Sequence, residues 1–390
     1  MRINLIYLIL IFFLMSCGEE TTKPSDFNAP SDLSLTLIDG TTIRVRWIDN
    51  SSYETGFVLQ RRSGNQSFAE IDTLSSDTEA YLDENLNVNT IYYYRVAAII
   101  KNEYSEWSNV RTLQTHSDIS DMSFGEDDKL EVMTWNIQHF PKNGDTTINY
   151  AAEIIKALQV DIIAMQEMGI ESNFDELLQK VNEIDGDHEW IGEWRYSDSY
   201  GNNLAIIYNS DVLENVEIYN IQNNDWYCFP RAPLVLEADF AGEHFYLIDN
   251  HLKAMGDADS EERRRLACIK LDQYVQDYLS NENVIILGDL NDLLTDQEND
   301  NVFWNFIENS QSYFFVDMEI ANGDNEYWSY PSWPSHLDHI LITNELFDEF
   351  SNNGSVVSTI LIDHYMDGGF SEYDTYISDH RPVALKLVME

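Results

Sequence analysis

The chain has 390 residues, enough for two or more domains with their own cores, and we expect two. With 44% hydrophobic and 13% aromatic residues and no long low-complexity tract, the composition excludes a disordered chain. The 22 Lys and Arg against 69 Asp and Glu give a formal net charge of -47, which solubility in a salty or extracellular medium explains most simply and which disfavours long duplex DNA as the substrate.

Residues 1–17 carry the marks of an export signal. Basic Arg2 is followed by an apolar run from residue 3 to residue 14, which is too short to span a bilayer. The ending Leu14-Met15-Ser16-Cys17 resembles the bacterial lipoprotein processing box, which implies cleavage before Cys17 and a lipid on its thiol. The alternative is an ordinary signal peptide with a coincidental cysteine.

A polar tether over residues 18–28 then separates the anchor from the first domain. Glu19 and Glu20 resemble surface-export tags of some Gram-negative lipoproteins. We therefore expect an exported lipoprotein of the outer membrane or cell surface, on the periplasmic or extracellular face.

Residues 29–115 show short alternating runs separated by turn formers, the pattern of an all-β sandwich. Ile43, Val45 and Trp47 point to one face of a strand, and further strands include residues 57–62 and 92–96. The segment resembles a fibronectin type III domain through Trp47 and through residues 54–57, 90–96 and 104–108. The resemblance makes the tryptophan and the tyrosines core residues.

This first domain contains no catalytic constellation. We expect it to act as a spacer or as an adhesive module with a surface ligand. The acidic, polar residues 116–128 are predicted to form a linker, and residues 129–390 a second domain.

Polar side chains stand at the ends of several predicted strands of the second domain. The strands cover residues 130–136, 161–167, 245–253, 337–342 and 377–383, and residues 151–158 form an amphipathic helix after the first of them. Residues 283–287 form a further buried strand, after which Gly288 lets the backbone turn so that Asp289 and Asn291 project together. For any single strand a polar end is unremarkable, but their joint occurrence predicts one polar site.

Six ordered motifs resemble the endonuclease/exonuclease/phosphatase superfamily, which has the DNase I-like fold. The motifs are Trp135-Asn136, Gln166-Glu167, Asn250-His251-Leu252, Gly288-Asp289-Leu290-Asn291, Leu337-Asp338-His339-Ile340 and Ser378-Asp379-His380-Arg381-Pro382. The resemblance implies an α/β fold, a four-layer α/β/β/α sandwich of two packed sheets flanked by helices. It also implies divalent-metal-dependent cleavage of phosphodiesters or phosphomonoesters.

The residue types fit this chemistry. Hard oxygen ligands for Mg²⁺, or for Mn²⁺ or Ca²⁺, are offered by Glu167 with Asn136 and Asp379 nearby. The base for an attacking water is either His380 oriented by Asp338 or Asp289 itself. Further groups serve the phosphate: His251 and Asn291 donate to its oxygens, and the resemblance adds Arg231 and Tyr200 as phosphate contacts.

Two positions depart from the family pattern. Asn202 stands where related enzymes place a glutamate that orients the first histidine, which puts the basicity of His251 in doubt. Gly169 stands where DNase I-type enzymes place an arginine for the minor groove, so one duplex contact is missing. The aromatic residues before Asp338 either stack on a base or sugar or pack in their own loop; they are Tyr327, Trp328, Tyr330 and Trp333.

Besides Cys17 the chain has two cysteines. Cys228 and Cys268 either form a disulfide, as an oxidising compartment permits, or stay apart, since Cys268 shares a helical stripe with Leu271 and Val275 and so also fits a buried thiol.

These observations give three hypotheses for the function. The first is an exported metal-dependent nuclease or phosphodiesterase acting on nucleic acids or nucleotides, held at the membrane through Cys17. The second is a phospholipid or sugar-phosphate hydrolase of the same superfamily, favoured by the acidic charge and by Gly169. The third is a non-catalytic adhesion protein built on both domains.

Overall fold

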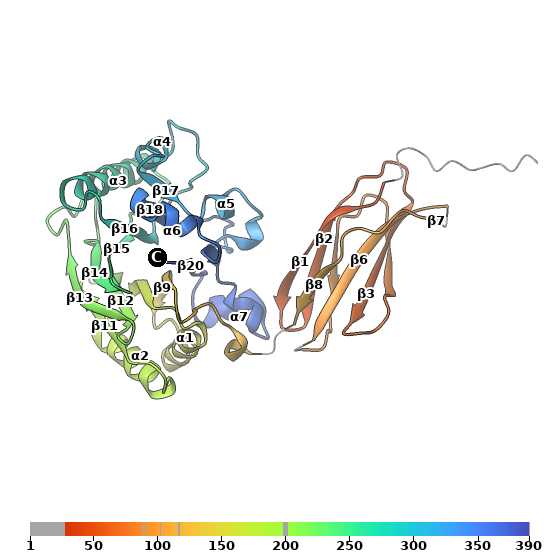
Figure 1. The fold of residues 1–390 in the computed structure, drawn as a ribbon, viewed down its shortest axis with the longest axis horizontal. Coiled ribbons are helices and arrows are strands. Elements are labelled where there is room, and N and C mark those ends of the chain that lie inside the picture. The colour runs from red at the N-terminus through yellow and green to blue at the C-terminus, as the bar shows by residue number, and fades with distance from the viewer. Residues whose placement is uncertain (1–27, 89, 102, 116–117, 198–201, 390) are drawn as a thin grey trace, which may run out of the picture. The chain divides into compact units, whose positions relative to one another are not determined.

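The computed structural model describes residues 28–88, 90–101, 103–115, 118–197 and 202–389 (Figure 1). The export signal with Cys17, and Tyr200 in the predicted site, lie outside these described residues. Within them, no helix is both long and apolar enough to cross a membrane. The chain divides into two compact units, which we describe one at a time.

The N-terminal unit is an all-β sandwich, as predicted. One sheet has the order β1-β2-β5, and the other has the order β4-β3-β6-β7 with β8 paired to β6. Ile43, Val45 and Trp47 on β2 are buried, and Trp47 packs against Phe57 on β3 with ring centroids 5.7 Å apart. The strands are β1 (Ser31–Asp39), β2 (Thr42–Ile48), β3 (Gly56–Ser63), β4 (Ala69–Ser75), β5 (Ala80–Asp83), β6 (Ile91–Ile100), β7 (Glu103–Tyr104) and β8 (Arg111–Gln114).

The C-terminal unit is built on two six-stranded sheets. The sheet that we call the β9 sheet has the order β11-β12-β10-β9-β20-β19, and the β16 sheet has the order β13-β14-β15-β16-β18-β17. The strands are β9 (Leu130–Phe140), β10 (Ile162–Met168), β11 (Trp190–Arg195), β12 (Asn203–Asn209), β13 (Leu213–Asn220), β14 (Leu234–Phe240), β15 (Glu243–His251), β16 (Asn283–Asp289), β17 (Tyr313–Phe315), β18 (Asp338–Thr343), β19 (Val356–Thr359) and β20 (Val383–Leu387).

Helices cover the outer faces of both sheets, which gives the predicted four-layer α/β/β/α sandwich (Figure 1). The long helices α1 and α2 pack on the β9 sheet, and α3 packs on the β16 sheet. The helices are α1 (Asp145–Leu158), α2 (Glu171–Ile184), α3 (Ala258–Tyr278), α4 (Trp304–Glu308), α5 (Met318–Ala321), α6 (Phe347–Ser351) and α7 (Gly369–Tyr376), with short 3₁₀ turns η1 (Ile119–Asp121), η2 (Asn325–Tyr327), η3 (Asn344–Leu346) and η4 (Ile362–Tyr365).

The layer between the sheets changes from apolar to polar toward one end. Alternation along β9 points Val132, Thr134 and Asn136 inward, and along β16 the same alternation points Ile285, Leu287 and Asp289 inward. The apolar members form the shared core of the two sheets. The polar members gather at one edge of this layer, where Asn136 Nδ2 lies 2.9 Å from Asp289 Oδ2 across the two sheets.

Two sequence predictions about the backbone were wrong in detail. Gly288 does not end its strand: it pairs with Asn250 inside the sheet, and a Cβ on it would lie 1.8 Å from the Asn250 carbonyl oxygen. Its positive φ of 141° thus serves a close approach of two strands rather than a turn. The segment 377–382 is a loop that leads into β20 and not part of a strand, because its polar residues bond to neighbouring loops and strand ends.

Candidate active site

Asp289 lies at the centre of the polar edge, at the last position of β16. In the parallel pairing with β15 it faces His251, and in the antiparallel pairing with β18 it faces Asp338. Ligand atoms of Asp289, Asp338 and His380 all lie within 4.8 Å of one another. The strand pairing therefore brings Asp289 and Asp338 together, and the loop before β20 adds His380 to them.

Asn136 links the two sheets at this edge. Its Nδ2 donates to Asp289 Oδ2 at 2.9 Å and lies 3.3 Å from Glu167 Oε1. Asn136 is opposite Gln166 in the pairing of β9 with β10, which puts Glu167 at the rim. The amide thus holds the carboxylates of Glu167 and Asp289 close to each other across the interface between the sheets.

Glu167 has a left-handed backbone, with φ of 60°, at an irregularity in the pairing of β10. This conformation is uncommon for a side chain other than glycine or asparagine and is often found at functional positions. Glu167 Oε2 accepts a hydrogen bond from the His139 backbone at 3.1 Å, and His139 Nδ1 lies 3.3 Å away. The carboxylate is therefore fixed in place by β9.

His251 is buried at the end of β15. Its Nε2 lies 3.3 Å from Arg231, which can only donate, and 3.5 Å from Asp289 Oδ2, which can only accept when ionised, so the two contacts favour different tautomers. Burial, together with the charges of Arg231 and His380, holds the pKa of His251 well below its usual range. Among the described residues nothing hydrogen-bonds to Nδ1.

His380 is held by Asp338, whose Oδ2 lies 2.7 Å from His380 Nδ1. Burial opposes a charge on this ring, but the carboxylates of Asp338, Asp289 and Asp379 outweigh it and raise the pKa of His380 to about 10. The imidazole is therefore protonated at neutral pH. Tyr330 packs over it, with ring centroids 4.7 Å apart.

Asp379 and Asn291 lie at the rim of the cluster. Gln138 donates to Asp379 Oδ2 at 2.7 Å, and burial raises the pKa of the Asp379 carboxyl. Asn291 has φ of 57°, and its backbone donates to Asp289 Oδ1 at 3.1 Å. Its amide nitrogen donates to the Leu252 carbonyl at 3.4 Å, so the side chain lies beside the end of β15.

The cluster has a surplus of negative charge. Burial raises the pKa of Asp289 to about 7, with Asp338 and Glu167 adding to the shift and His380 opposing it. Asp338 Oδ1 is buried without a hydrogen-bond partner in the described part of the chain. Oxygen donors in excess of the nearby positive charge suit a hard divalent cation, and the carboxylates of Glu167 and Asp379 at this edge fit such an ion. Asn136 turns its Nδ2 toward Glu167 and Asp289, so its one ligand atom is Oδ1, which accepts from the Gln138 backbone at 3.0 Å.

The structure also shows how Gly169 and the aromatic residues before Asp338 are placed. A Cβ at Gly169 would lie 2.1 Å from the Phe140 carbonyl oxygen, so the backbone there leaves no room for an arginine. Of the four aromatic residues before Asp338, Tyr330 contacts the site, Trp328 donates to the Ile320 carbonyl, and Trp333 is 77% exposed.

The possible disulfide is absent. Cys228 and Cys268 are free, buried thiols that pack in the same apolar cluster under α3. Burial raises the pKa of both thiols, most strongly that of Cys268. Cys268 is instead a buried thiol on the apolar stripe of α3, as the second alternative predicted.

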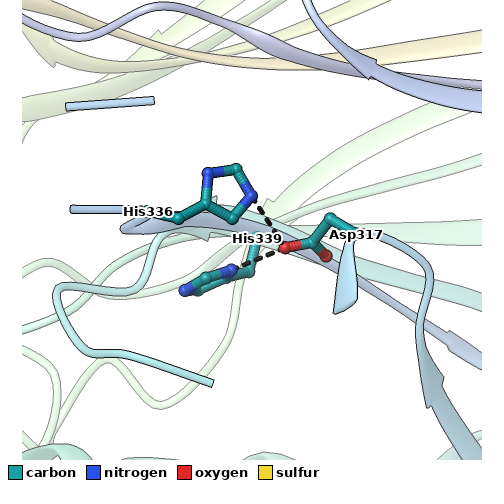
Figure 2. A group of neighbouring side chains, drawn as sticks. All are labelled: Asp317, His336 and His339. Carbon is teal, nitrogen blue, oxygen red and sulfur yellow. Dashed lines mark hydrogen bonds and ion pairs between the residues drawn. The ribbon is translucent and has the colours of Figure 1, made fainter. Parts of the chain in front are cut away.

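A second cluster of histidine and aspartate lies on the opposite face of β18, made of Asp317, His336 and His339 (Figure 2). Asp317 Oδ2 lies 2.7 Å from His339 Nδ1 and 3.1 Å from His336 Nε2. His339 Nε2 lies 2.9 Å from the Asp292 carbonyl, so both of its nitrogens face acceptors. Burial disfavours the charge on His339, but Asp317 outweighs it and raises the pKa of that imidazole.

The hydrogen bonds around this second cluster describe an ion pair. His336 Nδ1 accepts from the Ser329 backbone at 3.2 Å, so in the neutral ring the proton lies on Nε2, the atom that faces Asp317. A nitrogen that carries a proton has no lone pair for a cation. We call this group the Asp317 triad.

Family comparison agrees with the geometry. Residues 133–380 match the model of the Endonuclease/Exonuclease/phosphatase family, and residues 28–114 match that of the fibronectin type III domain. The chain belongs to the endonuclease/exonuclease/phosphatase family. Members of this family are phosphoester hydrolases that generally use divalent metals.

Several solved structures are similar to this chain. Danio rerio TDP2 complexed with a single-strand DNA product is 15% identical, with a TM-score of 0.48 over 67% of this chain and 99% of that one. A Bacteroides vulgatus endonuclease/exonuclease/phosphatase is 16% identical, with a TM-score of 0.47 over 67% and 99%. The human Nocturnin catalytic domain with bound sulfate is 17% identical, with a TM-score of 0.47 over 66% and 94%.

One curated relative is a Titin homolog of Caenorhabditis elegans, which is 26% identical over 95 residues. The match covers 23% of this chain and 0% of that much longer protein. The match is therefore limited to a stretch about as long as one small domain.

Sequence reasoning missed three residues that support the site. Gln138 and His139 continue β9 past Asn136 with φ of 30° and 51°, and they hold Asp379 and Glu167. Ser378 donates to the Asn136 carbonyl at 2.6 Å and accepts from the His380 backbone at 3.0 Å. Their positions next to predicted site residues were the available signal, but backbone conformation decided their roles.

Proposed function

We propose that the protein is an exported, lipid-anchored, divalent-metal-dependent phosphoesterase that cleaves phosphodiester bonds of nucleic acids or nucleotides with an activated water. The observation that carries this proposal is the convergence of Glu167, Asn136, Asp289, Asp338 and His380 on one edge of the sheet interface. Family membership supports phosphate-ester hydrolysis. Export and anchoring rest on the sequence of residues 1–17.

Asp289 is the base in this proposal. Burial raises its pKa to about 7, which lets the carboxylate take a proton from water near neutral pH. Asn136 and the Asn291 backbone each donate to one of its oxygens, so its orientation is fixed. His380 is the weaker candidate for this role, because it is already protonated when it is paired with Asp338.

His380 and Arg231 serve the phosphate. Both are positively charged, and they lie on either side of Asp289, the first beside Asp338 and the second beside His251. Fixed positive groups stabilise the charge that develops on phosphate oxygens in the transition state. A divalent cation held by Glu167, with Asn136 and Asp379 beside it, would supply further charge compensation.

The test is a substrate panel with matched variants. Purified protein without its signal segment is incubated with single-stranded and duplex nucleic acid and with bis-p-nitrophenyl phosphate, in Mg²⁺ or Mn²⁺, with and without EDTA. We expect EDTA-sensitive turnover that Glu167→Gln abolishes and that Glu171→Gln, an exposed glutamate four residues later, leaves unchanged. An absence of EDTA-sensitive turnover on every substrate would disprove the proposal.

A phospholipid or sugar-phosphate hydrolase is the second candidate. It is favoured by the net charge of -47, which repels polyanions, and by Gly169, where a side chain for the minor groove has no room. This candidate predicts release of phosphate or of a phosphorylated head group while DNA stays intact. An adhesion protein without catalysis would show no turnover on any substrate, and Glu167→Ala and His380→Ala would change nothing measurable other than surface binding.

A further inference from the structure

Three carboxylates meet at one end of the N-terminal sandwich, far in sequence from the active site. Asp49 and Glu54 belong to the loop between β2 and β3, and Asp77 belongs to the loop between β4 and β5. One oxygen of each residue lies within 4.8 Å of an oxygen of each of the others. Like charges repel at this separation, so such an arrangement requires an explanation.

Backbone hydrogen bonds hold the three side chains in place. Asp49 Oδ1 accepts from the Ser51 backbone at 2.8 Å, and Glu54 Oε1 accepts from the Asp77 backbone at 3.3 Å. Asp77 has a left-handed backbone, with φ of 58°. The Asp49 backbone donates to Glu79 Oε1 at 3.1 Å, which brings a fourth carboxylate to the edge of the group. The two loops are thus tied together through their acidic residues.

Glu54 is the residue that the fold itself leaves unsatisfied. Its exposed fraction is 9%, and its Oε2 is buried with no hydrogen-bond partner among the described residues. A buried carboxylate oxygen that lacks a donor is costly, and native structures usually satisfy one with a protein donor, a water or a cation. Besides burial and the Ser51 amide, the groups that act on Asp49 are the carboxylates of Glu54, Asp77 and Glu79, all of which raise its pKa.

We propose that Asp49, Glu54 and Asp77 bind a divalent cation of the Ca²⁺ class. The ligands are all carboxylate oxygens, which are hard donors, and no histidine or cysteine takes part. Ca²⁺ accepts six to eight oxygens in flexible geometry, so water can complete a partly exposed site on two loops, whereas Mg²⁺ requires a near-octahedral arrangement. The site does not depend on the hydrolase function of the C-terminal domain.

Bound cation would stabilise the sandwich. It offsets the repulsion between the carboxylates, gives Glu54 Oε2 a partner and joins the two loops. A ligand that binds only the folded state raises the melting temperature as its concentration exceeds the dissociation constant. Extracellular calcium modules typically bind with dissociation constants of about 10⁻⁴ to 10⁻³ M, so millimolar Ca²⁺ is the range to examine.

The experiment compares variants of the whole chain after chelation. Equilibrium dialysis counts the Ca²⁺ ions bound per chain in about 0.15 M salt, which screens diffuse charge, and thermal unfolding follows stability. Glu54→Gln and Asp49→Asn remove the charge and nearly keep the shape. Glu103→Gln, an exposed glutamate on β7 outside the cluster, is the matched control. The active-site cation is common to all four proteins and cancels in the comparison.

We expect the wild type and Glu103→Gln to bind one Ca²⁺ more than the two cluster variants. Saturating Ca²⁺ raises the melting temperature of the N-terminal sandwich in these two proteins by about 5 °C. Without metal, the cluster variants melt at or above the wild type, because each removes a repelling charge. Equal Ca²⁺ binding by all four proteins would overturn the proposal. A rise in melting temperature with Ca²⁺ that persists in Asp49→Asn would also overturn the proposal. This variant keeps the test valid even if Glu54→Gln fails to fold.

Discussion

The two faces of β18 carry two clusters made of the same residue types. On the inner face Asp338 holds His380 at 2.7 Å, and on the outer face Asp317 holds His339 at the same distance. Both ion pairs are buried. Their adjacent positions in one strand, residues 338 and 339, allow a direct comparison of a pair in the candidate active site with a structural pair.

The clusters differ in their charge. Around Asp338, three further carboxylates gather, and Asp338 Oδ1 and His251 Nδ1 have no partner among the described residues. In the Asp317 triad one carboxylate faces two histidines: Asp317 Oδ1 accepts from the Ile340 backbone at 2.9 Å and both nitrogens of His339 face acceptors. The triad also has an open position, because His336 Nε2 lies 3.1 Å from Asp317 Oδ2 without a hydrogen bond. A buried pair or an open position alone therefore does not mark a catalytic site, whereas the surplus of carboxylates around Asp338 distinguishes the two clusters.

The first way to test this comparison is Asp289→Asn. We expect catalytic efficiency on the best substrate to fall about 10²- to 10⁴-fold, because the amide cannot accept a proton. The melting temperature should stay equal or rise, since the change removes a buried charge from an acidic group. A melting temperature that falls with full activity retained would contradict the assignment of Asp289 to the site.

Asp317→Asn should show the opposite behaviour. Removing one member of a buried ion pair leaves His339 charged without compensation, which costs about 3–5 kcal/mol of the free energy of unfolding. Urea unfolding measures this loss, and turnover per folded molecule should change little. If turnover falls as far as in Asp289→Asn while stability holds, the Asp317 triad belongs to the active site and the comparison fails.

A third buried pair, this one of two carboxyls, sharpens the comparison through pH. Glu131 and Asp161 lie at the opposite end of the β9 sheet. Burial raises the pKa of Glu131 to about 9 and that of Asp161 to about 6, and the two carboxyls act on each other. Both values are higher than in the unfolded chain, so protons favour the folded state. This stabilisation is complete below pH 4 and is lost as the pH rises through about 6 and about 9.

We therefore expect the melting temperature to fall by several degrees between pH 5 and pH 9, on the order of 5 °C. Glu131→Gln should flatten this dependence and melt above the wild type at pH 9. Glu126→Gln, an exposed glutamate that shares Lys386 with Glu131, is the matched control and should keep the slope. An unchanged slope in Glu131→Gln would show that other groups control it.

The smallest expected effect is that of Tyr330→Leu. Its ring packs over His380, and contacts between aromatic rings contribute about 0.5–1.5 kcal/mol, so catalytic efficiency should fall roughly 3- to 10-fold. Tyr327→Leu, three residues earlier on η2, is the control and should leave turnover unchanged. If the two changes lower catalytic efficiency equally, the loss comes from a disturbed loop and not from the contact between Tyr330 and His380.

Much of this arrangement could be predicted from the sequence, because strand periodicity fixes which face a residue takes. The sequence placed Asn136 and Asp289 each at the end of a strand, and the structure shows that the two side chains meet across the sheets, with Asn136 Nδ2 2.9 Å from Asp289 Oδ2. The placement of Asp338 and His380 followed from the family motifs. These residues contact each other as the motif order implied.

The rest depended on contacts between distant loops. The roles of Gln138 and Ser378 follow from left-handed and irregular backbone, which single-residue propensities do not indicate. Gly288 was read as a turn, although the close approach of Asn250 is what requires it. The Asp317 triad joins segments separated by about twenty residues, so no short sequence pattern predicts it.

The adjacent positions of Asp338 and His339 make β18 vulnerable to a change in length. Side chains alternate between the faces of a strand, so a shift of the pairing register of β18 by one residue would send its aspartate and its histidine to the opposite faces. The His339 imidazole would then face the polar edge around Asp289. The Asp338 carboxylate would face Phe303, Phe315 and the Asp317 carboxylate. Insertions in this strand should therefore be tolerated far less than insertions in the loops on either side of it.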